Sequence, residues 1–287
     1  MTGLSIERVA GALGAELHGL DLTRTLTDGE VDALRDAVLQ HKVVFLRHQP
    51  YATEHLERLT EQLGGHGHTP FLRSIDGHPG VVKVVKEADE AGFNFGGAWH
   101  SDWSFQPEPP SFTLLWSIDV PPHGGDTMWS NQELAFDTLS DGLQHTLRHV
   151  DVVHSAGRAY SADGFLARTA DGRSMRIDTN DDALVEHVHP AAPTHPDTGR
   201  AALFVNPTYT VRFDGWSVAD SAPLLQHLYA HSTRDAFTCR FRWSPDTLAI
   251  WDNRSTMHNA LNDYRGHRRE LHRTTVRGAA PQRVEAV

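Results

Sequence analysis

The sequence predicts a mainly β protein, a sandwich or barrel, with helices at the N-terminus and inserted between the strands. Two observations lead to this prediction. From about residue 80 onward, short β-branched and aromatic runs are separated by Pro and Gly, which is typical of all-β sandwiches and barrels. Before that point, and twice within the β region, apolar residues recur at helical spacing instead.

The first 65 residues predict a helix, a strand and a second helix. Thr27-Asp28-Gly29-Glu30 is a capping box, in which a threonine begins a helix and a glutamate follows three residues later. Val43–Leu46 is a short apolar run that predicts a buried strand. Thr53 is predicted to cap the second helix, which Gly64-Gly65 would end.

Seven later runs predict strands. They are Val81–Val85, Phe112–Ile118, Val150–Val153, Ala201–Val205, Thr238–Trp243, Thr247–Trp251 and Leu271–Val276. Two amphipathic segments, Leu143–Val150 and Leu224–His231, predict helices. Residues 155–200 are polar and rich in Ala, Asp, Thr and Pro, which predicts a long insertion or lid, and residues 279–287 predict a loose tail.

Composition excludes several classes of protein. The net charge of −11 argues against nucleic acid as the main partner, because phosphate binding needs a basic surface. The single cysteine, Cys239, excludes an internal disulfide framework and favours a reducing compartment. The N-terminus has no apolar core of signal-peptide length, and no run approaches the about 18 apolar residues of a membrane span. We therefore expect a cytoplasmic protein that does not enter membranes.

The histidine content is unusually high, with twenty histidines in the chain, and it suggests a metal site. Four His-x-Asp/Glu pairs could each present two ligands: His55/Glu57, His100/Asp102, His149/Asp151 and His195/Asp197. On a strand, residues two apart point to the same face, whereas on a helix they do not. His55 and Glu57 lie in the second predicted helix, so this pair is excluded as a metal site. The last two pairs lie at a helix end and in a turn. His100/Asp102 lies among aromatic residues after two glycines, and it is the best candidate.

A third ligand would complete the two-histidine, one-carboxylate triad of non-haem Fe(II) sites, which leaves three coordination positions open. His258 is the best candidate, since it follows an apolar strand and a polar turn. Arg269 and Arg273 come 11 and 15 residues later and would share one face of a strand. A guanidinium donates two parallel hydrogen bonds to a carboxylate, which makes both arginines candidates for binding anions.

In combination these features resemble the TauD/TfdA family of Fe(II)- and 2-oxoglutarate-dependent dioxygenases. The resemblance runs in a fixed order over nearly the whole chain. It is carried by Gly14–Leu22, Val43–Arg47, Trp99–Asp102, Gly124–Thr127, Leu203–Asn206, Trp251–Arg254, His258 and the arginine-bearing strand. It implies one domain over residues 1–287, folded as a double-stranded β-helix, or jelly roll, with helices packed outside.

The resemblance also implies roles for individual residues. His100, Asp102 and His258 match the iron ligands, and Thr127 and Arg269 match the pair that holds the distal carboxylate of 2-oxoglutarate. These enzymes couple decarboxylation of 2-oxoglutarate by O2, which yields succinate and CO2, to oxidation of an aliphatic C–H bond. The carboxylate at position 102 favours hydroxylation over halogenation. Homodimers and homotetramers are common in the family.

The expected substrate is a small organic anion. Arg273 matches the arginine that faces the anionic group, and His68 aligns with a histidine that contacts sulfonate in taurine-type members. Those members have a tyrosine where this chain has Phe71 and an asparagine where it has Gly96, which disfavours taurine. Several short sequence motifs of this chain are closer to those of phenoxypropionate-type members. In those members, hydroxylation beside an ether oxygen leads to cleavage of the ether. Four aromatic residues could form the pocket: Phe71, Trp103, Phe105 and Tyr160.

Three alternatives stay open at this stage. A natural-product tailoring oxygenase of the same family would share every motif. A cupin-type metalloprotein could use His187 and His189, which lie two apart with Glu186 beside them. A catalytically silent jelly-roll binding module is the third alternative, and the intact set of ligand and cosubstrate residues argues against it.

Overall fold

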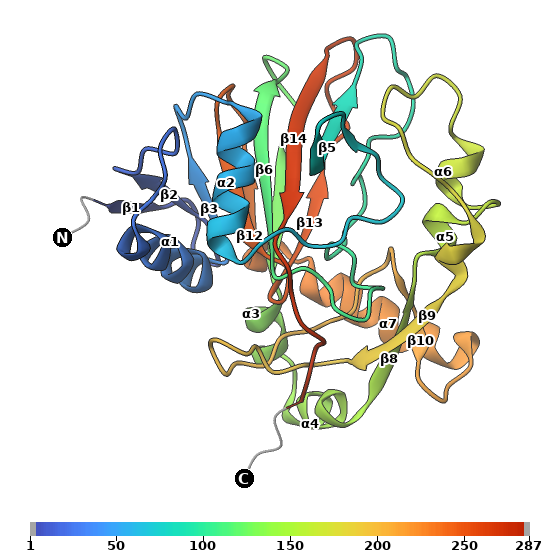
Figure 1. The fold of residues 1–287 in the computed structure, drawn as a ribbon. Helices are drawn as coiled ribbons and strands as arrows, with labels where there is room; N and C mark the ends of the chain where they lie inside the picture. The colour runs from blue at the N-terminus through green and yellow to red at the C-terminus, as the bar shows by residue number, and fades with distance from the viewer. Residues whose placement is uncertain (1–3, 284–287) are drawn as a thin grey trace.

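The computed structural model describes residues 4–283 and confirms a mainly β fold with added helices (Figure 1). The largest sheet contains β1 Ser5–Arg8, β2 Ala15–His18, β3 Val43–Leu46, β4 Ser74–Ile75, β5 His78–Lys86, β6 Phe112–Asp119, β12 Leu248–Asp252 and β14 Arg269–Thr275. Its order is β1-β2-β3-β12-β6-β14-β5-β4. Neighbours are antiparallel except β2 and β3, which are parallel.

Two smaller sheets complete the β structure of residues 4–283. One contains β7 Thr127–Asn131, β11 Thr238–Phe241 and β13 Thr256–Ala260, in the order β11-β7-β13. The other contains β8 Asp151–Ser155, β9 Glu186–Pro190 and β10 Thr210–Phe213, in the order β10-β8-β9. The β11-β7-β13 sheet packs against the large sheet, since Phe241 stacks on Phe45 at 3.7 Å between ring centroids and Trp129 meets Trp251 edge to face.

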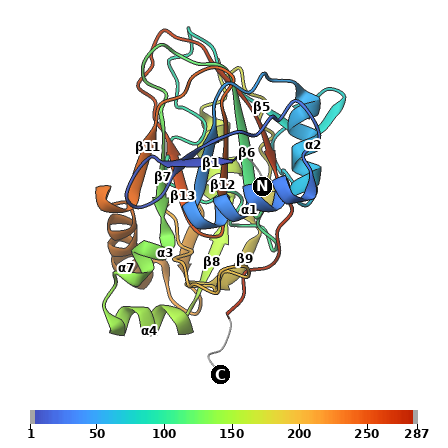
Figure 2. The ribbon, with the colours of Figure 1, turned by 90° about the vertical axis from the view of Figure 1, so that its left-hand side faces the viewer.

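The large sheet is apolar on both faces because its central strands have a hydrophobic core on each side. Along β3, Val43 and Phe45 enter the core shared with the β11-β7-β13 sheet, whereas Val44 and Leu46 enter a second core. That second core is closed by α1 Asp28–His41 and α2 Thr53–Leu63, which lie on the same side of the sheet (Figures 1 and 2). One face of the large sheet therefore points toward a space between sheets, where polar side chains can be held away from water.

The other helices lie mainly beside the smaller sheets. They are α3 Gln132–Asp137, α4 Asp141–His149, α5 Gly157–Tyr160, α6 Phe165–Arg168 and α7 Val218–Ser232, with the 3₁₀ helices η1 Asp181–Leu184 and η2 Asp235–Phe237. The segment 155–200 contains α5, α6, η1 and β9, and β9 adds an edge strand to β8. None of the helices in residues 4–283 is long and apolar enough to cross a membrane.

Most local predictions are confirmed. The Thr27–Glu30 capping box forms, with both reciprocal bonds present. The Val43–Leu46 strand is β3, and six of the seven later runs coincide with β5, β6, β8, β11, β12 and β14. The two predicted helices are α4 and α7. Gly64 ends α2 at φ +138°, a conformation that favours glycine.

Two local predictions are wrong. Thr53 is the first residue of α2 and not its cap; the cap position is Ala52, and the Thr53 hydroxyl lies 2.9 Å from that of Tyr51. Ala201–Val205 is not a strand, although it is almost wholly buried. Its N–H groups bond in turn to the carbonyls of Pro193, Gln132 and Ala191. No single neighbouring strand can form a ladder with it, so burial without a common partner leaves the segment irregular.

The described part of the C-terminal tail, up to Arg283, contacts the rest of the protein. The Gln282 carbonyl accepts a hydrogen bond from the Thr194 N–H at 2.8 Å, and Arg283 pairs with Asp151. The rest of the predicted loose tail, residues 284–287, lies outside the described residues.

Candidate active site

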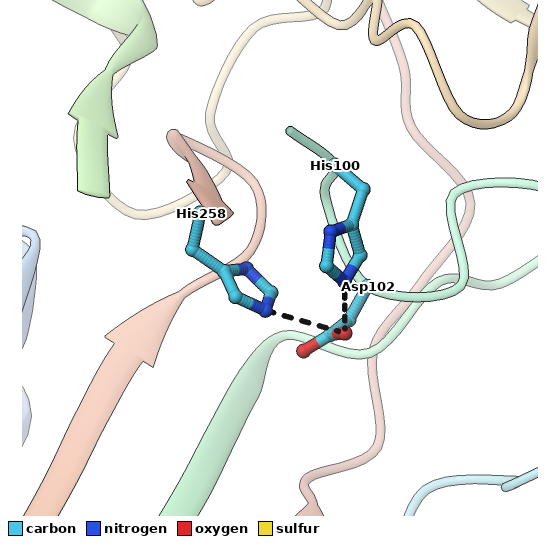
Figure 3. Close-up of side chains that lie close together, drawn as sticks. All are labelled: His100, Asp102 and His258. Atoms are coloured by element: carbon cyan, nitrogen blue, oxygen red, sulfur yellow. Dashed lines mark ion pairs between the residues drawn. The ribbon is translucent and has the colours of Figure 1, made fainter. Parts of the chain in front are cut away.

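Three predicted metal ligands meet between the sheets. His258 is on β13, and His100 is joined to it by two backbone hydrogen bonds of 3.0 and 2.8 Å. His100 Nε2 and His258 Nε2 lie 3.5 and 3.9 Å from Asp102 Oδ1 (Figure 3). All three side chains are buried. The two-residue spacing of His100 and Asp102 works here through a single bridge followed by a turn, not through the strand that the spacing predicted.

The pKa shifts of Asp102 and His258 suit a divalent metal. Burial alone would raise the pKa of Asp102, but Arg273 and the two histidines outweigh it and hold that pKa well below its usual range. Burial lowers the pKa of His258, so its ring is neutral. His100 Nδ1 lies 2.7 Å from the Ala98 carbonyl, which orients Nε2 toward Asp102. Two imidazoles and a carboxylate are the donor set of a non-haem Fe(II) site, so the residues fit that metal.

The Oδ2 atom of Asp102 is fixed by a chain of hydrogen bonds that the sequence did not predict. Thr113 on β6 donates to Asp102 Oδ2 at 2.7 Å, and its own oxygen accepts from Asn253 at 2.8 Å. The Trp251 indole then donates to Asn253 at 2.9 Å. Oδ2 is thereby occupied, which turns Oδ1 toward the histidines.

Arg269 is buried beside the predicted metal ligands, and no anionic side chain of residues 4–283 pairs with it. It is 3% exposed, its Nε and Nη2 make no hydrogen bond, and no carboxylate of residues 4–283 forms an ion pair with it. Burial lowers its pKa. Because an unpaired buried cation is costly, an anion bound from outside would stabilise Arg269. Thr127 on β7 lines the same small cavity, and its hydroxyl oxygen accepts from Trp243 at 3.0 Å, which leaves its proton free to donate.

Arg273 lies on the same face of β14 as Arg269, as the spacing predicts. Its Nη2 is 2.8 Å from Asp102 Oδ1, and its guanidinium lies 4.8 Å from the centre of the Trp103 ring. Within residues 4–283, neither Nε nor Nη2 has a partner aligned for a hydrogen bond. Tyr160 meets Trp103 at 5.9 Å and stacks on Phe71 at 5.0 Å between centroids. Three of the predicted substrate residues, Phe71, Trp103 and Tyr160, therefore gather beside a fourth, Arg273.

His68 is the predicted substrate residue that the structure does not bring to this cluster. It lines a separate surface hollow with His66, Glu108 and Arg277. Its backbone carbonyl accepts a hydrogen bond from Gln106 at 3.1 Å. Nothing in the structure directs its ring toward the metal ligands.

Three histidines of the antiparallel strands β8 and β9 hold the turn that follows Asp102. His154 lies 3.0 Å from the Ser104 hydroxyl, His187 lies 2.8 Å from the Phe105 carbonyl, and His189 lies 2.9 Å from the Gln106 carbonyl. His187 and His189 thus have hydrogen-bonding roles. Within residues 4–283, His100, Asp102 and His258 are the one group of ligand-type side chains close enough to share a metal ion. The cupin-type alternative therefore has no geometric support.

Two of these histidines, His154 and His189, are buried and should make stability depend on pH. Burial lowers the pKa of His154 to about 3 and that of His189 to about 4. The unfolded chain protonates such rings near pH 6.5, so the free energy of unfolding should fall as pH drops from about 6.5 to about 4. The loss approaches about 1.4 kcal/mol per pH unit for each histidine. Urea unfolding of the wild type and of His154→Gln would test this, and an equally steep decline in the variant would contradict it.

Comparisons with known proteins agree with this chemistry. The profile of the taurine catabolism dioxygenase TauD, TfdA family matches residues 5–275. An alpha-ketoglutarate-dependent sulfate ester dioxygenase of Pseudomonas putida is 32% identical over 286 residues, covering 98% of this chain and 92% of the relative. An alkylsulfatase of Acinetobacter baylyi is 31% identical over 277 residues, covering 96% of this chain and 85% of the relative.

Solved structures agree as well. A taurine dioxygenase from Burkholderia xenovorans superimposes with a TM-score of 0.80 at 33% identity, covering 97% of this chain and 90% of the other. AAD-2, solved with Mn(II) and N-oxalylglycine, superimposes with a TM-score of 0.79 at 25% identity, covering 97% and 99%. This chain therefore belongs to the TauD/TfdA family and is a Fe(II)- and 2-oxoglutarate-dependent dioxygenase.

Proposed function

We propose that His100, Asp102 and His258 hold the iron, and that Thr127 and Arg269 hold the distal carboxylate of 2-oxoglutarate. Bound iron, 2-oxoglutarate and O2 supply the oxidation, with release of succinate and CO2 and transfer of one oxygen atom to a C–H bond. The support is the three converging ligand atoms and the unpaired Arg269 in the same cavity.

The protein's own side chains position the reactants. Thr113 holds one oxygen of Asp102, so that the other keeps a fixed direction. Arg269 offers two N–H groups to a carboxylate, and Thr127 can add a third donor. The surrounding core, which includes Trp251 and Leu115 beside the ligands, keeps bulk water away and strengthens each of these interactions.

We infer that the substrate is a sulfate ester. The observation that carries this inference is Arg273, a buried guanidinium that lies over Trp103 and forms an ion pair with Asp102. Its Nε and Nη2 N–H groups have no aligned hydrogen-bond acceptor among residues 4–283. A compact oxyanion placed there keeps its neighbouring carbon close to the metal ligands. Phe71 and Gly96 offer no side-chain donor or acceptor to the amino group of an aminosulfonate. The relatives from Pseudomonas putida and Acinetobacter baylyi, a sulfate ester dioxygenase and an alkylsulfatase, support this choice.

Hydroxylation of the carbon bonded to the ester oxygen would cleave such a substrate. The new hydroxyl and the sulfate oxygen then share one carbon. Loss of the hydroxyl proton and departure of the sulfate from that carbon leave an aldehyde and inorganic sulfate. The two-electron oxidation is the one supplied by 2-oxoglutarate and O2.

A succinate-release screen tests the substrate class. The purified enzyme with Fe(II), ascorbate and 2-oxoglutarate is offered primary alkyl sulfates, sulfonates including taurine, aryloxyalkanoates and amino-acid derivatives. We expect alkyl sulfates to give the most succinate, in a one-to-one ratio with released sulfate. A clear preference for taurine, or succinate release without sulfate release, would contradict the proposal.

Arg273 should act on the substrate more than on the cosubstrate. Arg273→Gln should lower kcat/KM for an alkyl sulfate by about 30-fold or more, because truncating one partner of a buried charge pair costs about 2–5 kcal/mol. The KM for 2-oxoglutarate should change by less than about threefold. Arg273→Lys keeps the charge and should recover part of the activity. Equal losses for substrate and cosubstrate would show that the role is wrongly assigned.

We also propose that the large sheet and the β11-β7-β13 sheet are the two halves of a double-stranded β-helix within a single domain. Their facing aromatic side chains, Phe45 with Phe241 and Trp129 with Trp251, support this. A homodimer or homotetramer located in the cytoplasm stays a prediction from the sequence. Light scattering of the purified protein would test the oligomeric state.

A further inference from the structure

A second cavity adjoins the cavity that contains the metal ligands. It has a volume of about 310 Å³, within the range of roughly 300–1,000 Å³ that is typical of ligand pockets. Phe95, Gly96 and His100 line both cavities. A molecule in the second cavity would therefore meet the ring of a metal ligand at its inner end.

The walls of this cavity come from three separate segments and are almost entirely apolar. They are the loop 93–98, helices α5 and α6 of the predicted insertion, and residues 207–209. Phe93 and Phe165 meet edge to face at 5.0 Å between centroids and so join the loop to α6. Their side chains are 47% and 37% exposed. Large apolar side chains left in water next to a cavity commonly mark a binding site.

Among the described residues, Arg158 is the one arginine or lysine that lines this cavity, and no acidic residue lines it. Arg158 on α5 is exposed, makes a long 3.4 Å contact to the Thr210 carbonyl, and forms no ion pair with a carboxylate of residues 4–283. A substrate with an ammonium group at its far end would be repelled there, whereas a neutral apolar chain would not. The electrostatics therefore disfavour aminosulfonates, in agreement with the loss of polar contacts at Phe71 and Gly96.

We propose that this cavity is the subsite for an unbranched alkyl chain of the substrate, whose anionic head lies on Arg273. The inference rests on the proposed function and extends it to the tail of the substrate. His100 lies at the junction, so the first carbons after the head pass the metal ligands while the rest of the chain contacts Phe165 and Leu166. Helices α5 and α6 then act as the wall that selects chain length, which gives the insertion 155–200 a role in specificity.

A chain-length series tests the subsite. Primary alkyl sulfates that differ by one methylene should show kcat/KM rising about fourfold per carbon, which corresponds to about 0.8 kcal/mol per buried CH₂, until the cavity is full. Leu166→Trp should fill the cavity, so long chains should lose at least about tenfold in kcat/KM while short chains keep theirs. Phe165→Ala should reduce the gain per carbon. Trp216→Ala is the control, because Trp216 is 41% exposed yet lines neither cavity.

The outcomes separate this inference from the proposed function. If alkyl sulfates are cleaved but kcat/KM does not depend on chain length, or if Leu166→Trp and Phe165→Ala affect short and long chains equally, the subsite is wrong and the sulfate-ester function stands. If alkyl sulfonates or carboxylates are the substrates and show the same chain-length dependence, the subsite stands and the sulfate-ester function is wrong.

Discussion

His258→Ala should abolish succinate release and weaken Mn(II) or Co(II) binding by at least about 100-fold. The substitution removes one of the three proposed metal ligands. Removing a residue that only hydrogen-bonds to a ligand lowers metal affinity by about 10–100-fold, and the loss of a ligand itself should be larger. His258 is the best ligand to remove, because its Nδ1 makes no hydrogen bond. Asp102→Ala would instead leave Arg273 and Thr113 without their partner and could unfold the protein. Isothermal titration calorimetry with the metal alone measures the effect without any turnover.

His189→Ala is the matched control for this experiment. His189 is also a buried histidine on a β-strand, but it lies against the Gln106 carbonyl and not in the ligand cluster. We expect the variant to lose stability, which thermal unfolding would report, and to keep metal binding within about threefold of the wild type. Loss of metal binding in His189→Ala, together with its retention in His258→Ala, would overturn the assignment of the metal centre.

Arg269→Met should raise the KM for 2-oxoglutarate by about 100-fold or more and leave the protein without cosubstrate as stable as the wild type, or more stable. The KM rises because the cosubstrate carboxylate loses a bidentate partner. Stability is kept because Arg269 is a buried cation that pairs with no carboxylate of residues 4–283, so its burial costs free energy. Methionine has a similar length and no charge, and it removes this desolvation cost. Steady-state kinetics and thermal unfolding measure the two effects separately.

Arg268 provides a control one residue away on the same chain. It lies near the surface and pairs with Glu87, Asp119 and Glu270. Arg268→Ala should leave the KM for 2-oxoglutarate unchanged. If Arg269→Met also left that KM unchanged, or if it destabilised the protein by several kcal/mol, Arg269 would be a structural residue and not the cosubstrate anchor.

The sequence by itself determined the parts of the site that lie close together along the chain. Arg269 and Arg273 are four residues apart on one strand, so the alternation of side chains puts both on the same face. His100 and Asp102 are only two residues apart, so they stay close together although a turn begins at Asp102. The capping box before α1 and the glycine after α2 are local in the same sense. Such signals survive without tertiary context because neighbouring residues alone supply the hydrogen bonds or the backbone freedom that they need.

Tertiary structure decided everything that depends on contacts between distant segments. The Thr113 bond to Asp102, the three histidines that hold the turn after it, and the cavity between α5–α6 and loop 93–98 join residues far apart in sequence. It also placed His68 away from the metal ligands and left Ala201–Val205 irregular. Residue type alone could not predict these results, because a buried threonine, histidine or apolar run takes its role from the partner that packing brings to it.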